Sequence, residues 1–141
     1  MPRCLQSISI VALLWSISIH MTAQDNYPRE AGQRVRYELI IEMPKAYLSG
    51  ILIMVRKTDE SIDASIVNEF GVSLLDFSYN EKRQKVKLHN VMKKLNKWYI
   101  KRVLRQDLKA ILAMMSSGEG NTYRNRYDMN YQFSVFNELE E

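Results

Sequence analysis

The first half of the chain alternates between apolar and polar residues, with the period of two that is typical of half-buried β-strands. Residues 34–43 show this best, because their charged side chains fall on one face. The apolar residues of the other face are Val35, Tyr37, Leu39, Ile41 and Met43. Similar patterns predict four more strands, at residues 46–57, 61–66, 72–80 and 85–89. The first of these four is apolar on both faces and is therefore expected to be central.

The apolar spacing becomes helical after Asn90, a residue type favoured at helix N-caps. One stripe consists of Leu88, Val91, Met92, Leu95, Trp98 and Tyr99, and a second, rotated stripe consists of Ile100, Leu104, Leu108, Ile111 and Met115. Because the stripes do not coincide, we expect a long helix that is bent, broken near residues 98–102 or buried on two sides. Residues 118–130 are expected to be a polar, flexible connection to a last strand at 131–136.

The length of 141 residues fits one domain with a single core. Strands at spacings of about ten residues, with no long crossover helix between them, indicate an antiparallel meander rather than a parallel sheet. We therefore predict an α+β fold, in which a curved antiparallel sheet of about five to six strands is covered on one face by a long bent or broken helix. The domain is expected to span residues 34–137, followed by an acidic tail at 138–141.

Residues 1–23 have the features of a secretory signal peptide. Arg3 supplies a positive end, residues 8–19 form an apolar run, and the small residue Ala23 offers a cleavage site. Cleavage there would leave a polar leader at residues 24–33 and a periplasmic or secreted protein. The alternatives are an uncleaved N-terminal anchor and a buried first helix.

Cysteine usage agrees with export without a lipid anchor. The single Cys, Cys4, precedes the apolar run, whereas a bacterial lipid attachment site needs a Cys at the end of that run. A chain cleaved after Ala23 would have no thiol, which excludes disulfides, thiolate zinc sites and cysteine nucleophiles from the mature protein.

The pattern of polar residues indicates neither catalysis nor metal binding. After the predicted signal peptide the only histidine is His89, and a lone histidine at a strand end is usually structural. Asp59, Glu60 and Asp63 cluster in a predicted hairpin turn, and Asp76 fits the solvent face of a strand. The chain contains no nucleophile elbow, glycine-rich phosphate loop or calcium loop. We therefore expect a non-enzymatic protein with no cofactor and no metal site.

Positive charge is concentrated in residues 82–109, which contain eleven Lys or Arg and one acid. Trp98 and Tyr99 lie between lysines, as aromatics do in binders of single-stranded nucleic acid, but the helical spacing places both on the apolar side. Because export also separates the protein from nucleic acid, we expect no nucleic-acid partner. The basic residues form either a solvated helix face or a contact for anionic lipid headgroups or an acidic envelope protein. This predicted basic surface consists of Lys93, Lys94, Lys97, Lys101, Arg102 and Arg105.

The order of elements resembles that of the Lol-type lipoprotein-sorting carriers and receptors of the bacterial envelope. The shared pattern is an exported single domain, an antiparallel meander that includes VNEFGVSLLDFSYN at residues 67–80, and then a helix over the sheet; it spans residues 34–136. The resemblance implies a half-barrel whose concave apolar face, closed by helices, accepts acyl chains. The chain departs from the group in being shorter than typical members and in lacking the receptor's lipid-attachment Cys, which argues against membrane anchoring.

Two functions fit these features. The first is an exported periplasmic binding or carrier domain for a lipid or lipidated protein, in which apolar ligand surface moves from water into a groove between sheet and helix. The residues expected to line this groove are Tyr37, Leu39, Ile41, Ile53, Val55, Leu75, Phe77, Trp98 and Leu104. Each of them is an ordinary core residue if the interface is filled. The second function is a small envelope protein–protein interaction module, with a filled core, that binds an acidic partner through the basic helix face.

Overall fold

A computed structural model of the protein describes residues 27–136. The predicted signal peptide, residues 24–26 of the predicted leader and the acidic tail lie outside the described residues. Within the described part, none of the helical segments has both the length and the hydropathy needed to cross a bilayer.

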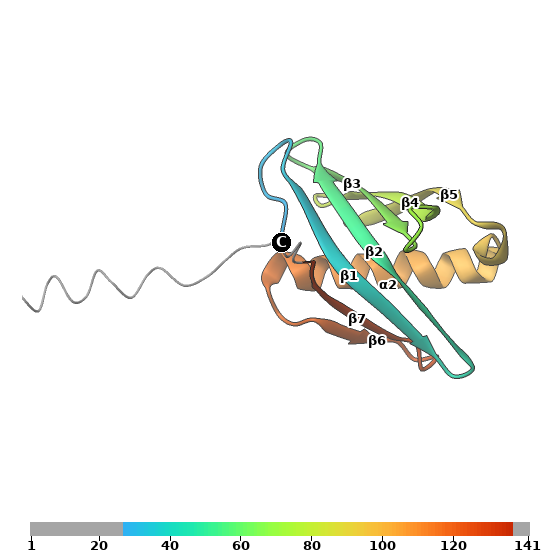
Figure 1. Cartoon of the computed structure of the whole chain (residues 1–141). Helices are drawn as coiled ribbons and strands as arrows, with labels where there is room; N and C mark the ends of the chain where they lie inside the picture. Colours follow the sequence, from blue (N-terminus) through green and yellow to red (C-terminus); the bar gives the residue numbers. More distant parts are fainter. Residues whose placement is uncertain (1–26, 137–141) are drawn as a thin grey trace, which may run out of the picture.

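The described chain forms one antiparallel sheet and one long helix (Figure 1). The strands are β1 (Arg34–Met43), β2 (Ala46–Arg56), β3 (Ser61–Val67), β4 (Ser73–Asn80), β5 (Lys85–Val91), β6 (Thr122–Arg124) and β7 (Asn130–Val135). A 3₁₀ turn, η2 (Lys93–Leu95), precedes the helix α2 (Trp98–Ser117). The predicted antiparallel sheet with a helix packed on it is confirmed, although the sheet has seven strands within the described residues rather than five or six.

The strand order is β5-β4-β3-β2-β1-β7-β6. The first five strands form the predicted meander, whereas the β6–β7 hairpin returns to pair with β1 on the opposite side of the sheet. Ile41, for example, pairs with Leu48 of β2 on one side and with Tyr131 of β7 on the other. This return brings the loop between β6 and β7 close to the hairpin between β1 and β2.

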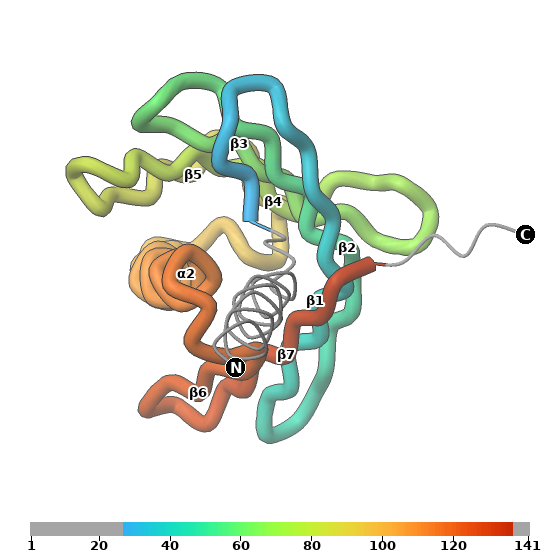
Figure 2. The backbone as a smooth tube through the Cα atoms, turned by 90° about the vertical axis from the view of Figure 1, so that its left-hand side faces the viewer, coloured from blue at the N-terminus to red at the C-terminus, as the bar shows by residue number. Residues whose placement is uncertain are grey.

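The sheet curls around α2 to form a half-barrel (Figure 2). Alternation along each strand directs one set of apolar side chains inward, as the period of a β-strand requires. The buried inward residues of the strands are Tyr37, Leu39, Ile41, Leu52, Met54, Ile62, Ala64, Ile66, Leu75, Phe77, Tyr79, Val86, Tyr131 and Phe133. The core therefore lies between the concave face of the sheet and the helix.

Helix α2 contributes its own apolar stripe to this core. Its buried apolar residues are Leu104, Leu108, Ile111, Leu112 and Met115. The helix ends at Gly118, whose φ of 71° lies in the left-handed region that glycine adopts without steric cost. The amide of Gly118 donates to the carbonyls of Met114 and Met115 at the helix end. The second predicted stripe is thus a true helical stripe.

The first predicted stripe, in contrast, is α-helical only at its end, where Trp98 and Tyr99 begin α2. Val91 ends β5, η2 follows, and the helix begins only at Trp98. The pattern was misleading because Met92 and Leu95, both packed against the core, are three residues apart, a spacing shared by 3₁₀ turns and α-helices. The break predicted near residues 98–102 therefore lies just before Trp98.

Residues 118–130, predicted to be an irregular connection, contain the short strand β6. Its three residues pair with β7 through Thr122–Gln132, Tyr123–Tyr131 and Arg124–Asn130. Two of the three are exposed, because β6 lies at the edge of the sheet. A short polar edge strand has no apolar alternation from which it could be predicted.

One end of the half-barrel is closed by a cluster that we call the N-terminal plug, which consists of Tyr27, Pro28, Arg56 and Glu81. Tyr27 and Pro28 are buried, and Arg56 is only 4% exposed. The Arg56 guanidinium donates to the Pro28 carbonyl from Nε at 3.0 Å and from Nη2 at 2.8 Å, and it forms an ion pair with Glu81. The Tyr27 hydroxyl donates to the Glu81 carboxylate at 3.0 Å. Burial, together with this carboxylate, raises the pKa of Tyr27 well above its usual value.

The N-terminal plug lies at the C-terminal end of α2. Arg29, which follows the plug in the chain, donates from Nη2 to the carbonyl of Ser116 at 2.6 Å. The end of the half-barrel beside the start of α2 has no such covering segment within the described residues, and the candidate site lies there.

Candidate ligand-binding groove

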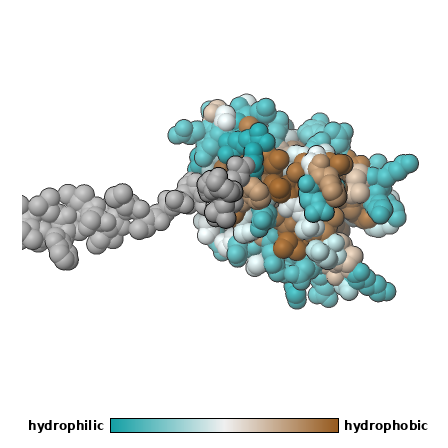
Figure 3. Space-filling model, in the orientation of Figure 1, coloured by the Kyte–Doolittle hydropathy of each residue, from teal (hydrophilic) through white to brown (hydrophobic). Residues whose placement is uncertain are grey.

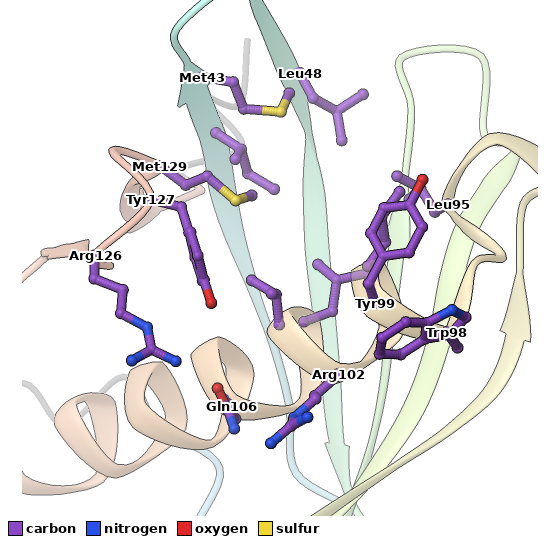
Figure 4. Close-up of a pocket in the computed structure, with 14 residues that line it drawn as sticks. Met43, Leu48, Leu95, Trp98, Tyr99, Arg102, Gln106, Arg126, Tyr127 and Met129 are labelled. Atoms are coloured by element: carbon purple, nitrogen blue, oxygen red, sulfur yellow. The ribbon is translucent and has the colours of Figure 1, made fainter.

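A groove of about 550 Å³ lies between the N-terminal half of α2, the β1–β2 hairpin and the loop between β6 and β7 (Figure 4). Pockets that hold small organic ligands usually have volumes of about 300–1,000 Å³. The groove is therefore large enough to hold much of such a ligand.

The inner surface of the groove is apolar. Its apolar residues, apart from aromatic ones, are Ile41, Met43, Leu48, Leu95, Ile100, Val103, Leu104 and Met129. Ile41 and Leu104 are buried, whereas Met43, Leu48 and Val103 are only half-buried. The apolar faces of β1, β2 and α2 thus extend past the filled core. Beyond it, their apolar side chains line the groove and are only partly covered by other side chains.

Three aromatic side chains stand at the mouth of the groove. Trp98 is 72% exposed, Tyr99 50% and Tyr127 53%. Trp98 and Tyr99 contact each other edge to face, with ring centroids 5.7 Å apart and an interplanar angle of 88°. Exposed apolar side chains that cluster around a concavity are typical of a ligand or partner site. Single exposed apolar residues scattered over a surface, in contrast, are common and indicate no site. Both α2 and the β6–β7 loop therefore present apolar surface to whatever occupies the groove.

The polar residues that line the groove are Arg102, Gln106 and Arg126. Arg102 and Gln106 are four residues apart on α2 and so share a helix face. In Figure 4 the polar ends of Arg102, Gln106, Arg126 and Tyr127 turn toward the same part of the rim. The Arg126 guanidinium lies 5.3 Å from the ring centroid of Tyr127. The rim therefore combines two permanent positive charges with neutral hydrogen-bonding groups.

The loop between β6 and β7 is held in place by Asn125. Its Oδ1 accepts hydrogen bonds from the amides of Tyr127 at 2.8 Å and Met129 at 3.1 Å. Its Nδ2 donates to Asp107 Oδ2 on α2 at 2.7 Å. A single asparagine thus fixes the loop that carries Arg126 and connects it to the helix on the other side of the groove.

Asp107 is the buried acid at the centre of this connection, with only 3% of its surface exposed. Its Oδ2 accepts from the Tyr131 hydroxyl at 2.6 Å as well as from Asn125. Burial raises the pKa of Asp107 above its ordinary value of 3.8, and the two hydrogen bonds offset part of that rise. Burial and the neighbouring carboxylate also raise the pKa of Tyr131. Asp107 therefore links α2 to β7 and to the β6–β7 loop.

Asp107 is expected to make the protein less stable as the pH rises above 3.8. The folded state holds the Asp107 proton more tightly than the unfolded state, so the free energy of unfolding falls from pH 3.8 up to the raised folded-state pKa and is constant above it. Asp107→Asn keeps an oxygen acceptor for Tyr131 and removes the titration. Urea denaturation of both proteins across this range should show that the free energy of unfolding of the variant increases relative to that of the wild type as the pH rises. A constant difference would show that folding does not raise the pKa of Asp107.

The structure separates the nine residues that we expected to line a groove into three groups. Ile41, Trp98 and Leu104 line the groove. Tyr37, Leu39, Leu75 and Phe77 are buried in the filled core. Ile53 and Val55 are half-buried and alternate with the inward residues Leu52 and Met54, so they lie on the convex face of the sheet. Figure 3 views that face, where apolar side chains gather over the middle of the sheet.

The predicted basic surface surrounds the start of α2. Lys93, Lys94 and Lys97 precede the helix, whereas Lys101, Arg102 and Arg105 lie on it. All are exposed except Lys101, which is half-buried, and none of the six forms an ion pair with another described residue. Arg102 is the one member of the set that lines the groove.

Sequence patterns missed the contribution of the β6–β7 loop, which supplies Arg126, Tyr127 and Met129. The segment has no periodicity, and the only signal available was an aromatic residue beside an arginine. Of the hairpin residues in the groove, Met43 and Leu48 were recognised as strand residues but not as groove residues.

Asp76 and His89, on the convex face of the sheet, form hydrogen bonds with neighbouring polar side chains. Asp76 accepts hydrogen bonds from Ser65 at 2.5 Å, Ser73 at 2.7 Å and Asn90 at 3.0 Å, and these bonds, led by that of Ser65, lower the pKa of Asp76. His89 shares a hydrogen bond of 2.9 Å with Ser78. Residues 27–136 contain no group of three or more His, Cys, Asp or Glu side chains placed to hold a metal ion. The hydrogen bonds of Asp76 and His89 are therefore accounted for as contacts within and between neighbouring strands of the sheet.

Comparisons of the chain with known proteins found no matching family model, no matching curated protein and no matching solved structure. The resemblance to the lipoprotein-sorting carriers and receptors stays a hypothesis based on the pattern of elements, and the groove is the feature that supports a function.

Proposed function

We propose that this protein is a non-enzymatic binding or carrier domain for a lipid or a lipidated protein, and that it acts in the cell envelope after export. The observation that carries the proposal is the apolar groove of about 550 Å³ at the start of α2. Its walls combine side chains of β1, β2 and α2 with those of Leu95 and of the β6–β7 loop, which Asn125 binds to α2, so the groove is present without a ligand.

The contrast between the two ends of the half-barrel supports this function. At one end the N-terminal plug fills the space between sheet and helix and satisfies the buried Arg56 with hydrogen bonds. At the other end exposed aromatic side chains stand around the groove. Leaving so much apolar surface in water costs free energy that an acyl chain in the groove would recover, at about 0.8 kcal/mol for each buried methylene.

Native mass spectrometry and lipid extraction of the protein purified from the envelope of its own host test the proposal. We expect an acyl lipid to co-purify with the folded protein. With added single-chain amphiphiles, affinity should rise roughly fourfold for each added methylene until the groove is full. The absence of both a co-purified lipid and any binding of added amphiphiles would overturn the proposal.

A second candidate function, an interaction module for an acidic envelope partner, is favoured by the unpaired basic side chains around the start of α2. The two functions differ in their response to salt, because exposed charges are screened within about 10 Å at 0.1 M salt whereas burial of acyl chains is not. Partner capture that disappears with salt, without any bound lipid, would favour the module.

A further inference from the structure

We propose that the ligand of the groove is a single-chain amphiphile with an anionic headgroup, whose carboxylate or phosphate is held by Arg102 and Arg126 while its chain lies along the apolar floor. This inference rests on the proposed function and adds to it the charge and position of the headgroup. Both arginines line the groove, one from α2 and the other from the β6–β7 loop.

The charge of the rim argues for an anion. Neither Arg102 nor Arg126 forms an ion pair with a carboxylate of the described residues, including Asp128 on the same loop as Arg126. Guanidinium groups donate several hydrogen bonds in a planar fork that matches a carboxylate or a phosphate. An anionic headgroup at this rim would thus give both arginines the acidic partner that no described residue of the protein supplies.

The arrangement of the loop argues that this contact is built in advance. The Tyr127 ring lies 5.3 Å from the Arg126 guanidinium, and Asn125 holds the amide of Tyr127. Asn125 is in turn bound to Asp107 on α2, one residue after Gln106. Arg126 is therefore positioned relative to the helix that carries Arg102, which reduces the entropy lost when both contact one headgroup.

The apolar floor argues for a chain rather than a free anion. The residues beyond the two arginines, such as Ile41, Leu48 and Leu104, offer no polar side-chain atom to a ligand. A small anion would use only the rim and leave the apolar surface in contact with water. An amphiphile uses both parts at once, so headgroup and chain together explain the whole lining.

The test measures the binding of four probes: dodecanoate, dodecyl phosphate, dodecan-1-ol and inorganic phosphate. The full chain carrying Trp15→Phe retains Trp98 as its only tryptophan, and Trp98 lies at the mouth of the groove, so its fluorescence reports occupancy. We expect both anionic amphiphiles to bind about tenfold more tightly than dodecan-1-ol, and inorganic phosphate not to bind measurably. The ratio of the two anionic affinities distinguishes a carboxylate from a phosphate headgroup.

The double variant Arg102→Gln/Arg126→Gln should lose the tenfold preference and keep the affinity for dodecan-1-ol. Its matched control is Arg105→Gln/Arg124→Gln, which removes the same charge at exposed residues of α2 and of β6, outside the groove lining, and it should retain the preference. Equal binding of dodecanoate and dodecan-1-ol by the Trp15→Phe chain would overturn the headgroup assignment and leave the proposed function standing. Failure of all three amphiphiles to bind would overturn both. Tight binding of inorganic phosphate alone would overturn the role of the chain.

Discussion

Val103→Trp is expected to abolish amphiphile binding without a large loss of stability. Val103 is half-buried on α2 and lines the groove, so the larger indole would occupy the space that an acyl chain needs. Displacing even four methylenes from the groove would cost roughly 3 kcal/mol of binding free energy, which corresponds to more than a hundredfold loss of affinity. Isothermal titration calorimetry with dodecanoate and with dodecan-1-ol measures this effect.

Ala113→Trp is the matched control, because Ala113 is exposed on the same helix and does not line the groove. It should bind both amphiphiles like the wild type. Leu48→Trp fills the groove from the sheet side and repeats the test if the helix variant does not fold. Undiminished binding in folded Val103→Trp and Leu48→Trp proteins would show that the amphiphile binds elsewhere.

Arg56→Met is expected to destabilise the protein by about 3–5 kcal/mol, the usual result of breaking a buried ion pair from one side. The variant removes the donor of two hydrogen bonds to the Pro28 carbonyl and the partner of the Glu81 carboxylate. Glu81, whose side chain is only 25% exposed, would keep the hydrogen bond from Tyr27 but lose its cationic partner. Chemical denaturation followed by circular dichroism measures the change in the free energy of unfolding.

Lys82→Met serves as the control for Arg56→Met, since it also removes a cation from an ion pair. The Lys82–Glu60 pair is 3.5 Å long, and its side chains are 76% and 50% exposed. Its removal should change stability by less than about 0.5 kcal/mol. If Arg56→Met costs no more than Lys82→Met, the N-terminal plug does not stabilise the fold. Glu81→Gln, which keeps one of the two oxygen acceptors that Arg56 and Tyr27 use, should cost less than Arg56→Met.

The strands of the meander were predictable because each carries its own local signal. The alternation at residues 34–43 matches β1 residue for residue, and that of residues 61–66 lies within β3. The apolar stripe from Ile100 to Met115 lies within α2. In these segments the face that the fold buries is the apolar face that the sequence periodicity already indicates.

Strand β2 shows where local pattern stops being informative. It is apolar on both faces, so alternation could not decide whether Leu52 and Met54 or Ile53 and Val55 face the helix. Pairing with β1, which aligns Tyr37 with Leu52 and Leu39 with Gly50, decided it. Arg56 is a further case, because a buried arginine is recognisable only once Pro28 and Glu81 are placed beside it.

By itself, the sequence determined the antiparallel meander, the apolar stripe of the helix and the concentration of positive charge near residues 93–105, because each depends on residues that are close together in the chain. The tertiary structure alone decided that β7 pairs with β1 and that a groove forms where Ile41, Leu48, Leu104 and the β6–β7 loop meet. A groove of this kind is made by contacts between distant segments, and an apolar side chain has the same identity whether it fills a core or faces a cavity. Only the position of its neighbours separates the two.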